Sequence, residues 1–418
     1  NIYSEEELKG IADRVINGEE NFSNVTITLR SNLDFGARKK EDGTWEGQEW
    51  TSVIGFLDEL EKNKNEVKEE LDLEKENLKR FAGCLNGNGF TIRGIYINSE
   101  KEYQGLFGYS SGTVENLTLK NSYISGKTSV GAIVGLNGGT VRNCTIINTI
   151  VNGKESKIGG IVGVSMSNSL ITQSYTEKCE ISGKDYVGGI VGYINNNADI
   201  IENTNTSKVS GENNVGGIAG IAFFGTTVQT NDNSGIINGK DYVGGIVGFS
   251  EAQLEKVNNR GEIKGHDFVG GILGANYIMG DASKSYNTGN ISGNNNIGGI
   301  SGTNNSSISN CYNTGSVKTE GYRAGGICGQ NASKSSIYNC YNVGNIDGNE
   351  SIGGVVGGEF GTTTNSYYLE EMLEDINSEQ AKKEEEFKNI SILDDLGEEF
   401  IEDSNNVNQG YPIISWQI

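Results

Sequence analysis

The sequence predicts an all-β protein, a parallel β-helix (solenoid) of about ten coils, and two observations lead to this prediction. First, the motif VGGIVG stands intact at Val187–Gly192 and Val243–Gly248, and eight variants of it follow a period of 26 to 29 residues. Second, the repeats contain short β-prone runs and no helical spacing of apolar residues. Such a period is typical of a solenoid. The last glycines of the ten copies are Gly108, Gly135, Gly163, Gly192, Gly220, Gly248, Gly274, Gly302, Gly329 and Gly357.

One repeat, Ile297–Tyr322, shows how a coil would form. It holds the β-prone runs IGGIS, SISNCYN and GSV, separated by polar or glycine-containing turns. A unit this short cannot bury its own apolar face, but stacked units can. Coils stacked about 4.8 Å apart would make a rod of roughly 50 Å. The general bias of parallel crossovers favours a right-handed coil.

A column of asparagines supports this register. Each is followed two residues later by glycine, and stacked amides can hydrogen-bond along the rod. We therefore predict an amide ladder and not a ligand site. The asparagines are Asn233, Asn259, Asn287, Asn313 and Asn342.

Residues 1–103 are expected to form a small α/β cap. Ser4–Gly18 reads as a helix, because Ser4 and Glu7 form a capping box. Val25–Phe35 alternates like a strand. The apolar face of the helix is Leu8, Ile11, Ala12 and Val15.

A charged segment interrupts this cap at residues 57–80. It is dense in Glu and Lys, has a patchy apolar face, and is predicted to form one or two helices. Phe81–Ile97 then returns to strands around an NGNG turn.

Residues 104–365 are assigned to the β-helix and residues 366–418 to a largely helical C-terminal cap. Within this cap we predict a helix over Ser378–Lys388 with Ser378 as its cap, a short helix over Ser391–Gly397 and a final strand over Tyr411–Trp416. Polar caps would block pairing between rod ends.

Charge is concentrated at the two ends of the chain. The 418 residues carry a net charge of −22, but residues 104–365 hold 19 acidic and 16 basic residues. A nucleic-acid partner needs a basic stripe, which this sequence lacks. No apolar run reaches the length of a membrane span, and the acidic flanks favour a monomer.

The chain begins at Asn1 and not at Met, which is consistent with an export signal having been removed.

The six cysteines include Cys311 and Cys340 at equivalent places in adjacent repeats. Stacking would bring their Cα atoms within disulfide range, but parallel neighbours rarely have the required torsion. We expect buried free thiols.

Chemical motifs are sparse. The single histidine, His266, rules out HExxH in this chain and is expected at a surface turn. Asp185, Asp241 and Asp267 share one turn position, with Asn at the equivalent Asn214 and Asn295. The carboxyls of Asp241 and Asp267 would lie roughly 5 Å apart, which a retaining glycosidase or a weak Ca²⁺ site could use. Turn capping explains these residues more simply, so no catalytic residue, metal or cofactor is predicted.

A tyrosine strip is the candidate binding surface. Tyr286, Tyr312 and Tyr341 occupy consecutive coils, Tyr367 follows one coil later, and Tyr175 precedes them. Alternation would place these rings outside the coil. They could stack on sugar faces or bind a protein, or they could simply stack on one another.

The chain resembles bacterial GLUG-motif surface proteins. The resemblance lies in LRSNLDF, EWTSVIG, FAGCLNGNGFTIRGI and GLFG, then the ten repeats, and finally SYYL and NQGYPIISW. It implies export, a parallel β-helix and display at the cell surface. The family includes adhesin-like proteins and non-catalytic regions of immunoglobulin-A-cleaving metalloproteases. The insert at residues 57–80 departs from the family pattern.

Three functional hypotheses follow. The first is a non-enzymatic secreted scaffold that binds a host or environmental glycan or protein. The second is a carbohydrate-active β-helix enzyme, and the third is a spacer region of a larger surface metalloprotease.

Overall fold

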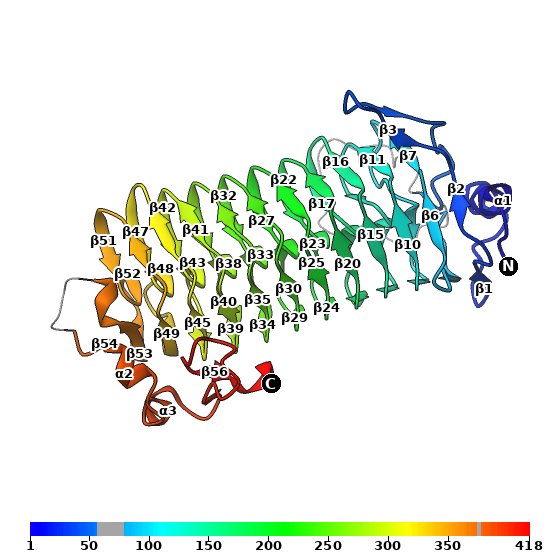
Figure 1. Ribbon diagram of the computed structural model, residues 1–418. Coiled ribbons are helices and arrows are strands. Elements are labelled where there is room, and N and C mark those ends of the chain that lie inside the picture. Colours follow the sequence, from blue (N-terminus) through cyan, green and yellow to red (C-terminus); the bar gives the residue numbers. More distant parts are fainter. Residues whose placement is uncertain (57–78, 374–377) are drawn as a thin grey trace.

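The computed structural model describes residues 1–56, 79–373 and 378–418. In these ranges the chain winds into a rod of parallel β-coils with additional structure at both ends (Figure 1). The predicted parallel β-helix of about ten coils is confirmed. The predicted helical insert lies almost wholly outside the described residues.

A typical coil contains five short strands, where the sequence suggested three β-prone runs. In a representative coil these are β42 (Asn295–Gly298), β43 (Ser301–Asn304), β44 (Ser307–Ser309), β45 (Tyr312–Asn313) and β46 (Val317–Thr319). Equivalent strands of neighbouring coils pair in parallel and form four sheets. We name these sheets by their strands in this coil: the nine-stranded β42 sheet, the ten-stranded β43 sheet, the 23-stranded β44–β45 sheet and the ten-stranded β46 sheet.

The repeated motif forms a corner and not a single strand. Val243 and Gly244 end β32 (Asp241–Gly244), and Val247 begins β33 (Val247–Ser250) after a bend. The corners stack in register, so that Val243 pairs with Val269. At the bend, a Cβ on Gly245 would lie 2.0 Å from the backbone oxygen of Gly271. Glycine is needed there because the backbones of adjacent coils approach too closely for any side chain.

The interior of the rod is mostly aliphatic, because the motif residues point inward coil after coil. Val187, Val215 and Val243 are fully buried, as are Ile190 and Ile218. All six cysteines are free and five are buried, which confirms the predicted thiols. Burial raises the pKa of Cys144 to about 12.

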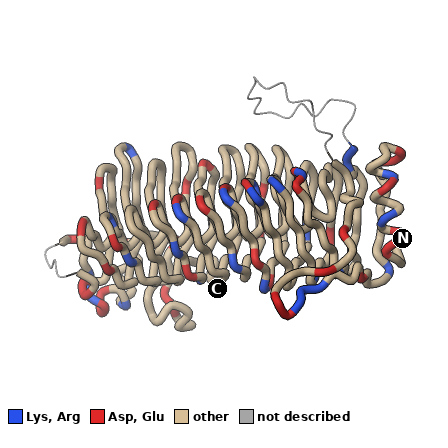
Figure 2. Tube along the Cα trace, turned by 90° about the horizontal axis from the view of Figure 1, so that it is seen from above, with Lys and Arg blue, Asp and Glu red and all other residues tan. Residues whose placement is uncertain are grey.

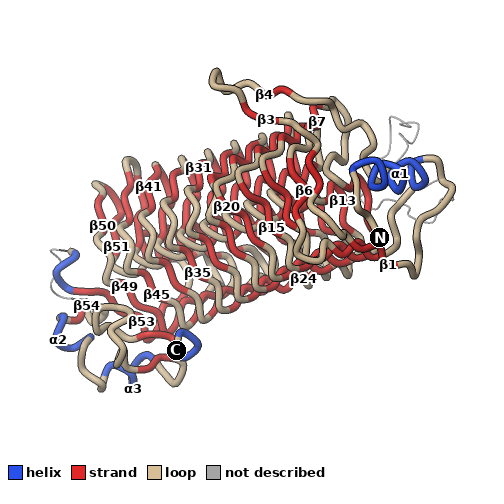
Figure 3. The backbone as a smooth tube through the Cα atoms, turned by 45° about the vertical axis from the view of Figure 1, so that its right-hand side comes forward, coloured by secondary structure: helices blue, strands red, loops and turns tan. Residues whose placement is uncertain are grey.

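The N-terminal helix closes one end of this core. Helix α1 (Glu5–Ile16) begins after Ser4, whose Oγ accepts a hydrogen bond from the Glu7 backbone N–H at 3.3 Å. Its face of Leu8, Ala12 and Val15 is buried against the first coils (Figure 3).

The strand predicted over Val25–Phe35 is instead two short strands, β1 (Thr26–Thr28) and β2 (Leu33–Asp34). These two pair with β5 (Cys84–Asn86) and β6 (Thr91–Arg93), which continue the β44–β45 sheet.

A hairpin of β3 (Arg38–Lys39) and β4 (Trp45–Glu46) projects over the rod near β7 (Tyr96–Asn98). Figure 3 shows this arm standing above the coils. Charged residues of both signs are scattered along the turns of the rod (Figure 2).

The C-terminal segment follows β53 (Thr362–Leu369) and η1 (Glu370–Met372). The helix predicted over Ser378–Lys388 is wrong in its first half, where β54 (Ala381–Lys382) pairs with β53, and only α2 (Glu384–Phe387) is helical. The free edge of the last coil offers backbone hydrogen bonds that a short isolated helix cannot match.

The remaining C-terminal elements match the prediction more closely. The short helix α3 (Ile392–Leu396) is confirmed. The predicted last strand is β56 (Ile413–Ile414), which pairs antiparallel with β55 (Phe400–Ile401) and ends in η2 (Ser415–Gln417). No helix in the described part of the chain is long and apolar enough to cross a membrane.

Candidate functional site

The predicted tyrosine strip exists as a stack of parallel rings. Tyr286 lies in β40 (Tyr286–Asn287), Tyr312 in β45 and Tyr341 in β49 (Ser336–Asn342), in register. The ring centroids are 5.0 and 5.1 Å apart, and the planes differ by 4° and 7°. Tyr367 pairs with Tyr341 in the next coil. The rings lie outside the coil, as alternation predicts.

The expectation that this strip is exposed is wrong for Tyr312 and Tyr341, which are 1% and 0% exposed. Tyr286 and Tyr367 are only half-buried. The C-terminal segment returns over the outer face of the rod and covers the rings, instead of only closing its end (Figure 1). The covering side chains include Phe387, Phe400, Tyr411, Ile414 and Trp416.

Hydrogen bonds fix this cover in place. Tyr341 Oη donates to the Pro412 carbonyl and accepts from Asn408 Nδ2 at 2.7 Å. Gln417 Nε2 donates to Tyr312 Oη at 2.8 Å. Burial raises the pKa of both phenols. The strip therefore binds the protein's own tail and offers little surface to another ligand.

The column of aspartates is confirmed as neighbouring side chains on one corner of the rod. Asp241 pairs with Asp267 in register. The structure corrects one equivalence: Asn213, and not Asn214, stands opposite Asp241. Asn213 Nδ2 donates to Asp185 at 2.7 Å, and Asn295 Nδ2 donates to Asp267 at 2.8 Å.

His266 lies at an exposed turn, as predicted, but it contacts this column. Its Nδ1 is 3.1 Å from Asp267 Oδ1 and 3.7 Å from Asp241 Oδ1. The sequence predicted that Asp241 and Asp267 lie together, but it did not connect His266 to them, although His266 and Asp267 are adjacent in the chain. A signal for this contact was present in the sequence, because His266 occupies the position at which other repeats carry Lys184 and Lys240.

A half-exposed aromatic surface lies along a different side of the rod, and we call it the aromatic band. Tyr186, Tyr242 and Phe268 stand in one column, and Tyr193 and Phe249 in the column across the corner. Their rings meet: Tyr186 and Tyr193 are 5.7 Å apart, and Tyr242 stacks on Phe268 at 4.8 Å.

Corner loops extend the aromatic band into solvent. Phe223 contacts Tyr193 at 5.3 Å, and its neighbour Phe224 is 50% exposed. Tyr277 contacts Phe249 at 5.4 Å and is 41% exposed, followed by Ile278 and Met279 at 62% and 61%. Each residue of the first column directly follows a residue of the aspartate column in the sequence. Tyr193 and Phe249 directly follow the repeated motif, but only the folded corner brings them and the loop residues beside the first column.

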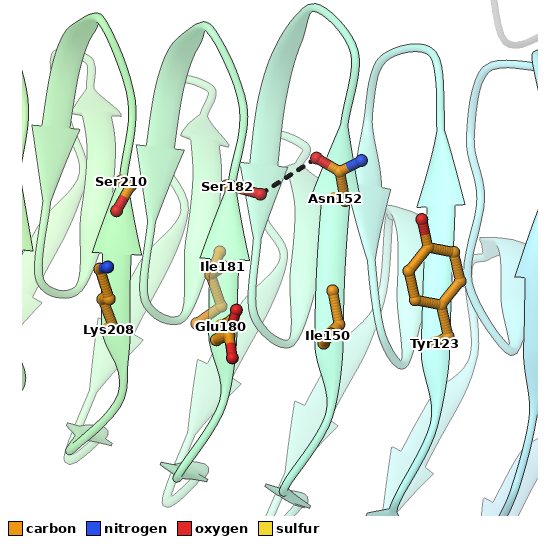
Figure 4. A pocket seen from close by; sticks show the side chains of 8 residues that line it. All are labelled: Tyr123, Ile150, Asn152, Glu180, Ile181, Ser182, Lys208 and Ser210. Atoms are coloured by element: carbon orange, nitrogen blue, oxygen red, sulfur yellow. Dashed lines mark hydrogen bonds between the residues drawn. The ribbon is translucent and has the colours of Figure 1, made fainter. Parts of the chain in front are cut away.

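A shallow pocket of about 260 Å³ lies on the outer face of the β46 sheet, close to the β3–β4 hairpin. Figure 4 shows its lining side chains in rows across four coils. Lys39 of the hairpin lies 3.7 Å from Glu180, and Trp45 packs 5.8 Å from Tyr123. Glu180 is the one carboxylate in the lining, so this pocket lacks the acid pair of a glycosidase. It is lined by Tyr123, Ile150, Asn152, Glu180, Ile181, Ser182, Lys208 and Ser210.

Comparisons with known proteins point to the repeat family. The family model described as "The GLUG motif" matches residues 320–347. A comparison with curated proteins finds no match.

Among solved structures, the chain is similar to a crystal structure of a protein provisionally described as an immunoglobulin A1 protease from Bacteroides ovatus. The identity is 17% and the TM-score 0.39, with 99% of this chain and 91% of that chain covered.

Proposed function

We propose that this chain, in which residues 320–347 match the GLUG motif and which folds as a parallel β-solenoid, is a non-enzymatic protein of the bacterial cell exterior whose rod binds a glycan or protein. The aromatic band is the observation that supports this proposal. Half-exposed rings of tyrosine and phenylalanine offer flat apolar faces, and tyrosine adds a hydroxyl. Such surfaces are typical of ligand and partner contacts.

The backbone under the first column of the aromatic band is left-handed. Tyr186, Tyr242 and Phe268 have φ of 56°, 58° and 57°. This left-handed conformation costs a residue with a Cβ about 1 kcal/mol or more. Asn214 and Asn296 occupy the same column at φ of 54° and 55°, and asparagine tolerates that conformation best. Lys157 and Arg323 also stand in this column at φ of 66° and 63°, so the coil corner imposes the conformation and the proposal depends on the rings themselves.

The carbohydrate-active alternative rests on Asp241 and Asp267. Their spacing follows from the strand pairing of any two adjacent coils, and the aspartate at the same place in an earlier coil, Asp185, is hydrogen-bonded to an asparagine. If the chain were only a spacer region of a larger metalloprotease, the aromatic band would have no binding partner.

The test replaces three rings of the aromatic band with asparagine, the residue that Asn214 and Asn296 supply in the column of Tyr242 and Phe268. Wild-type protein and the Tyr242→Asn/Phe249→Asn/Phe268→Asn variant are applied to a glycan array and to an array of extracellular proteins. We expect at least one wild-type ligand, with binding weakened tenfold or more in the variant.

Tyr338→Asn is the matched control, because Tyr338 is 39% exposed on the β44–β45 sheet and belongs to no aromatic cluster described above. Circular dichroism checks that both variants keep the fold. Equal binding by wild type and triple variant would contradict the proposal. So would hydrolysis of a polysaccharide by wild type that Asp241→Asn/Asp267→Asn abolishes.

A further inference from the structure

Two adjacent coils bring Asp241, His266 and Asp267 together on the corner beside the aromatic band. We propose that these three side chains bind one divalent transition-metal ion, with Zn²⁺ as the best fit. One ligand atom from each residue lies within 4.8 Å of the others. The donors are His266 Nδ1 and one carboxylate oxygen of each aspartate.

The separations suit a tetrahedral ion. With bonds of about 2.1 Å, two ligands of a tetrahedral Zn²⁺ lie roughly 3.4 Å apart. His266 Nδ1 lies 3.1 Å from Asp267 Oδ1 and 3.7 Å from Asp241 Oδ1. Small rotations of the side chains would equalise these distances. The fourth position faces solvent, because His266 is exposed.

A second observation concerns Asp241 itself. Its Oδ1 is buried and accepts no hydrogen bond from any described residue, although Asp185 and Asp267 of the same column each accept one from an asparagine amide. This oxygen is the one nearest to His266 Nδ1. An unsatisfied buried acceptor that faces an imidazole and a second carboxylate is what a metal ion would complete.

The residues around the three proposed ligands also suit a metal site. Asn295 Nδ2 donates to Asp267 Oδ1 at 2.8 Å and so orients that carboxylate, as outer hydrogen bonds do at metal sites. Imidazole with carboxylates favours Zn²⁺ and its transition-metal neighbours. Ca²⁺ prefers six to eight oxygen ligands, which this corner does not supply. The bound ion would add a link between two coils that already share backbone hydrogen bonds and the side-chain bond from Asn259 to Asn287.

The experiment uses ZnCl₂ and the full chain. Because His266 is the single histidine, NMR of one imidazole reports the site directly. We expect Zn²⁺ to shift the His266 Nδ1 resonance, isothermal titration calorimetry to give one Zn²⁺ per chain, and Co²⁺ to give the intense visible absorption of a tetrahedral complex. His266→Ala and Asp241→Asn should each weaken Zn²⁺ binding tenfold or more.

Asp185→Asn is the matched control, because Asp185 stands in the same column with Lys184 in place of the histidine. It should leave the affinity unchanged. An unshifted imidazole at saturating Zn²⁺ would overturn the proposal. Equal Zn²⁺ binding by wild type and His266→Ala would do the same, since it would place the ion on other acidic groups.

Discussion

At the scale of single residues, the asparagine ladder is the clearest hydrogen-bonded feature of the core. Six asparagines of the ladder are fully buried, and the Nδ2 of each of the first five donates to the Oδ1 of the next at 2.7 to 2.8 Å: Asn205, Asn233, Asn259, Asn287, Asn313 and Asn342. The same side chains also bond the backbone two residues on, as at Gly289. Both bonds depend on each amide occupying one place in every coil. The spacing of the sequence was therefore enough to predict them.

Removing one amide should show how much the ladder contributes to the free energy of unfolding. Asn287→Ala leaves the Gly289 N–H unpaired and removes one of the two hydrogen bonds of Asn259 Nδ2 and one of the two of Asn313 Oδ1. Each unsatisfied buried group costs about 1–3 kcal/mol. We expect the free energy of unfolding to fall by about 3 kcal/mol or more, measured by urea denaturation.

The control for this variant is Asn196→Ala, at an exposed asparagine between strands. It should change the free energy of unfolding by less than about 0.5 kcal/mol. Equal stabilities for the two variants would mean that the ladder contributes little.

At the scale of elements, the repeated corner decides where each coil turns. The motif places two glycines where backbones of successive coils meet, and their aliphatic neighbours point into the core. Sequence analysis read this stretch as one β-prone run. The bend between β32 and β33 was not visible, because alternating aliphatic residues and glycines suit a strand and a corner equally well.

Two glycine substitutions distinguish the effect of close backbone packing between coils from the effect of helix propensity. Gly245→Ala would press a Cβ to within 2.0 Å of the Gly271 carbonyl oxygen, and we expect it to destabilise the rod by several kcal/mol or to prevent folding. Gly10→Ala in α1 meets no atom within 4 Å. It should stabilise α1 by about 1 kcal/mol, since alanine favours a helix. Thermal melting followed by circular dichroism distinguishes them, and similar melting temperatures would contradict the close approach.

At the scale of the whole molecule, the C-terminal segment and the rod depend on each other. The segment buries the tyrosine stack, and the stack supplies the apolar surface on which α2, α3 and β55 pack. The sequence left two interpretations of the strip open, a ligand surface or rings that stack on one another, and the repeats alone leave these rings uncovered in both. Only the path of the non-repetitive tail shows otherwise.

This burial predicts a sensitivity to alkaline pH. Burial raises the folded-state pKa of Tyr312 and Tyr341 above the ordinary value of about 10. Below about pH 10 both states keep the phenol protons, so the stability is fully present. As the pH rises from there through the raised folded pKa, the unfolded chain loses protons first and stability falls.

The Tyr312→Phe/Tyr341→Phe variant should therefore lose stability less steeply between pH 10 and 11.5. The difference in slope should approach about 2.7 kcal/mol per pH unit for two groups. Urea unfolding at several pH values measures it, and Tyr322→Phe, at a ring 39% exposed, should leave the slope unchanged. Parallel curves for wild type and double variant would show that the stack does not control alkaline stability.

The sequence by itself determined the solenoid, its register and its ladders, because a side chain repeated at one period must stack on its equivalents once coils form. The cover over Tyr312 and Tyr341, the contact of His266 with Asp241 and the assembly of the aromatic band were decided only by the tertiary structure. These features join side chains across corners or from the non-repetitive tail. No period in the sequence encodes such contacts, since they depend on how the chain turns and where its ends pack.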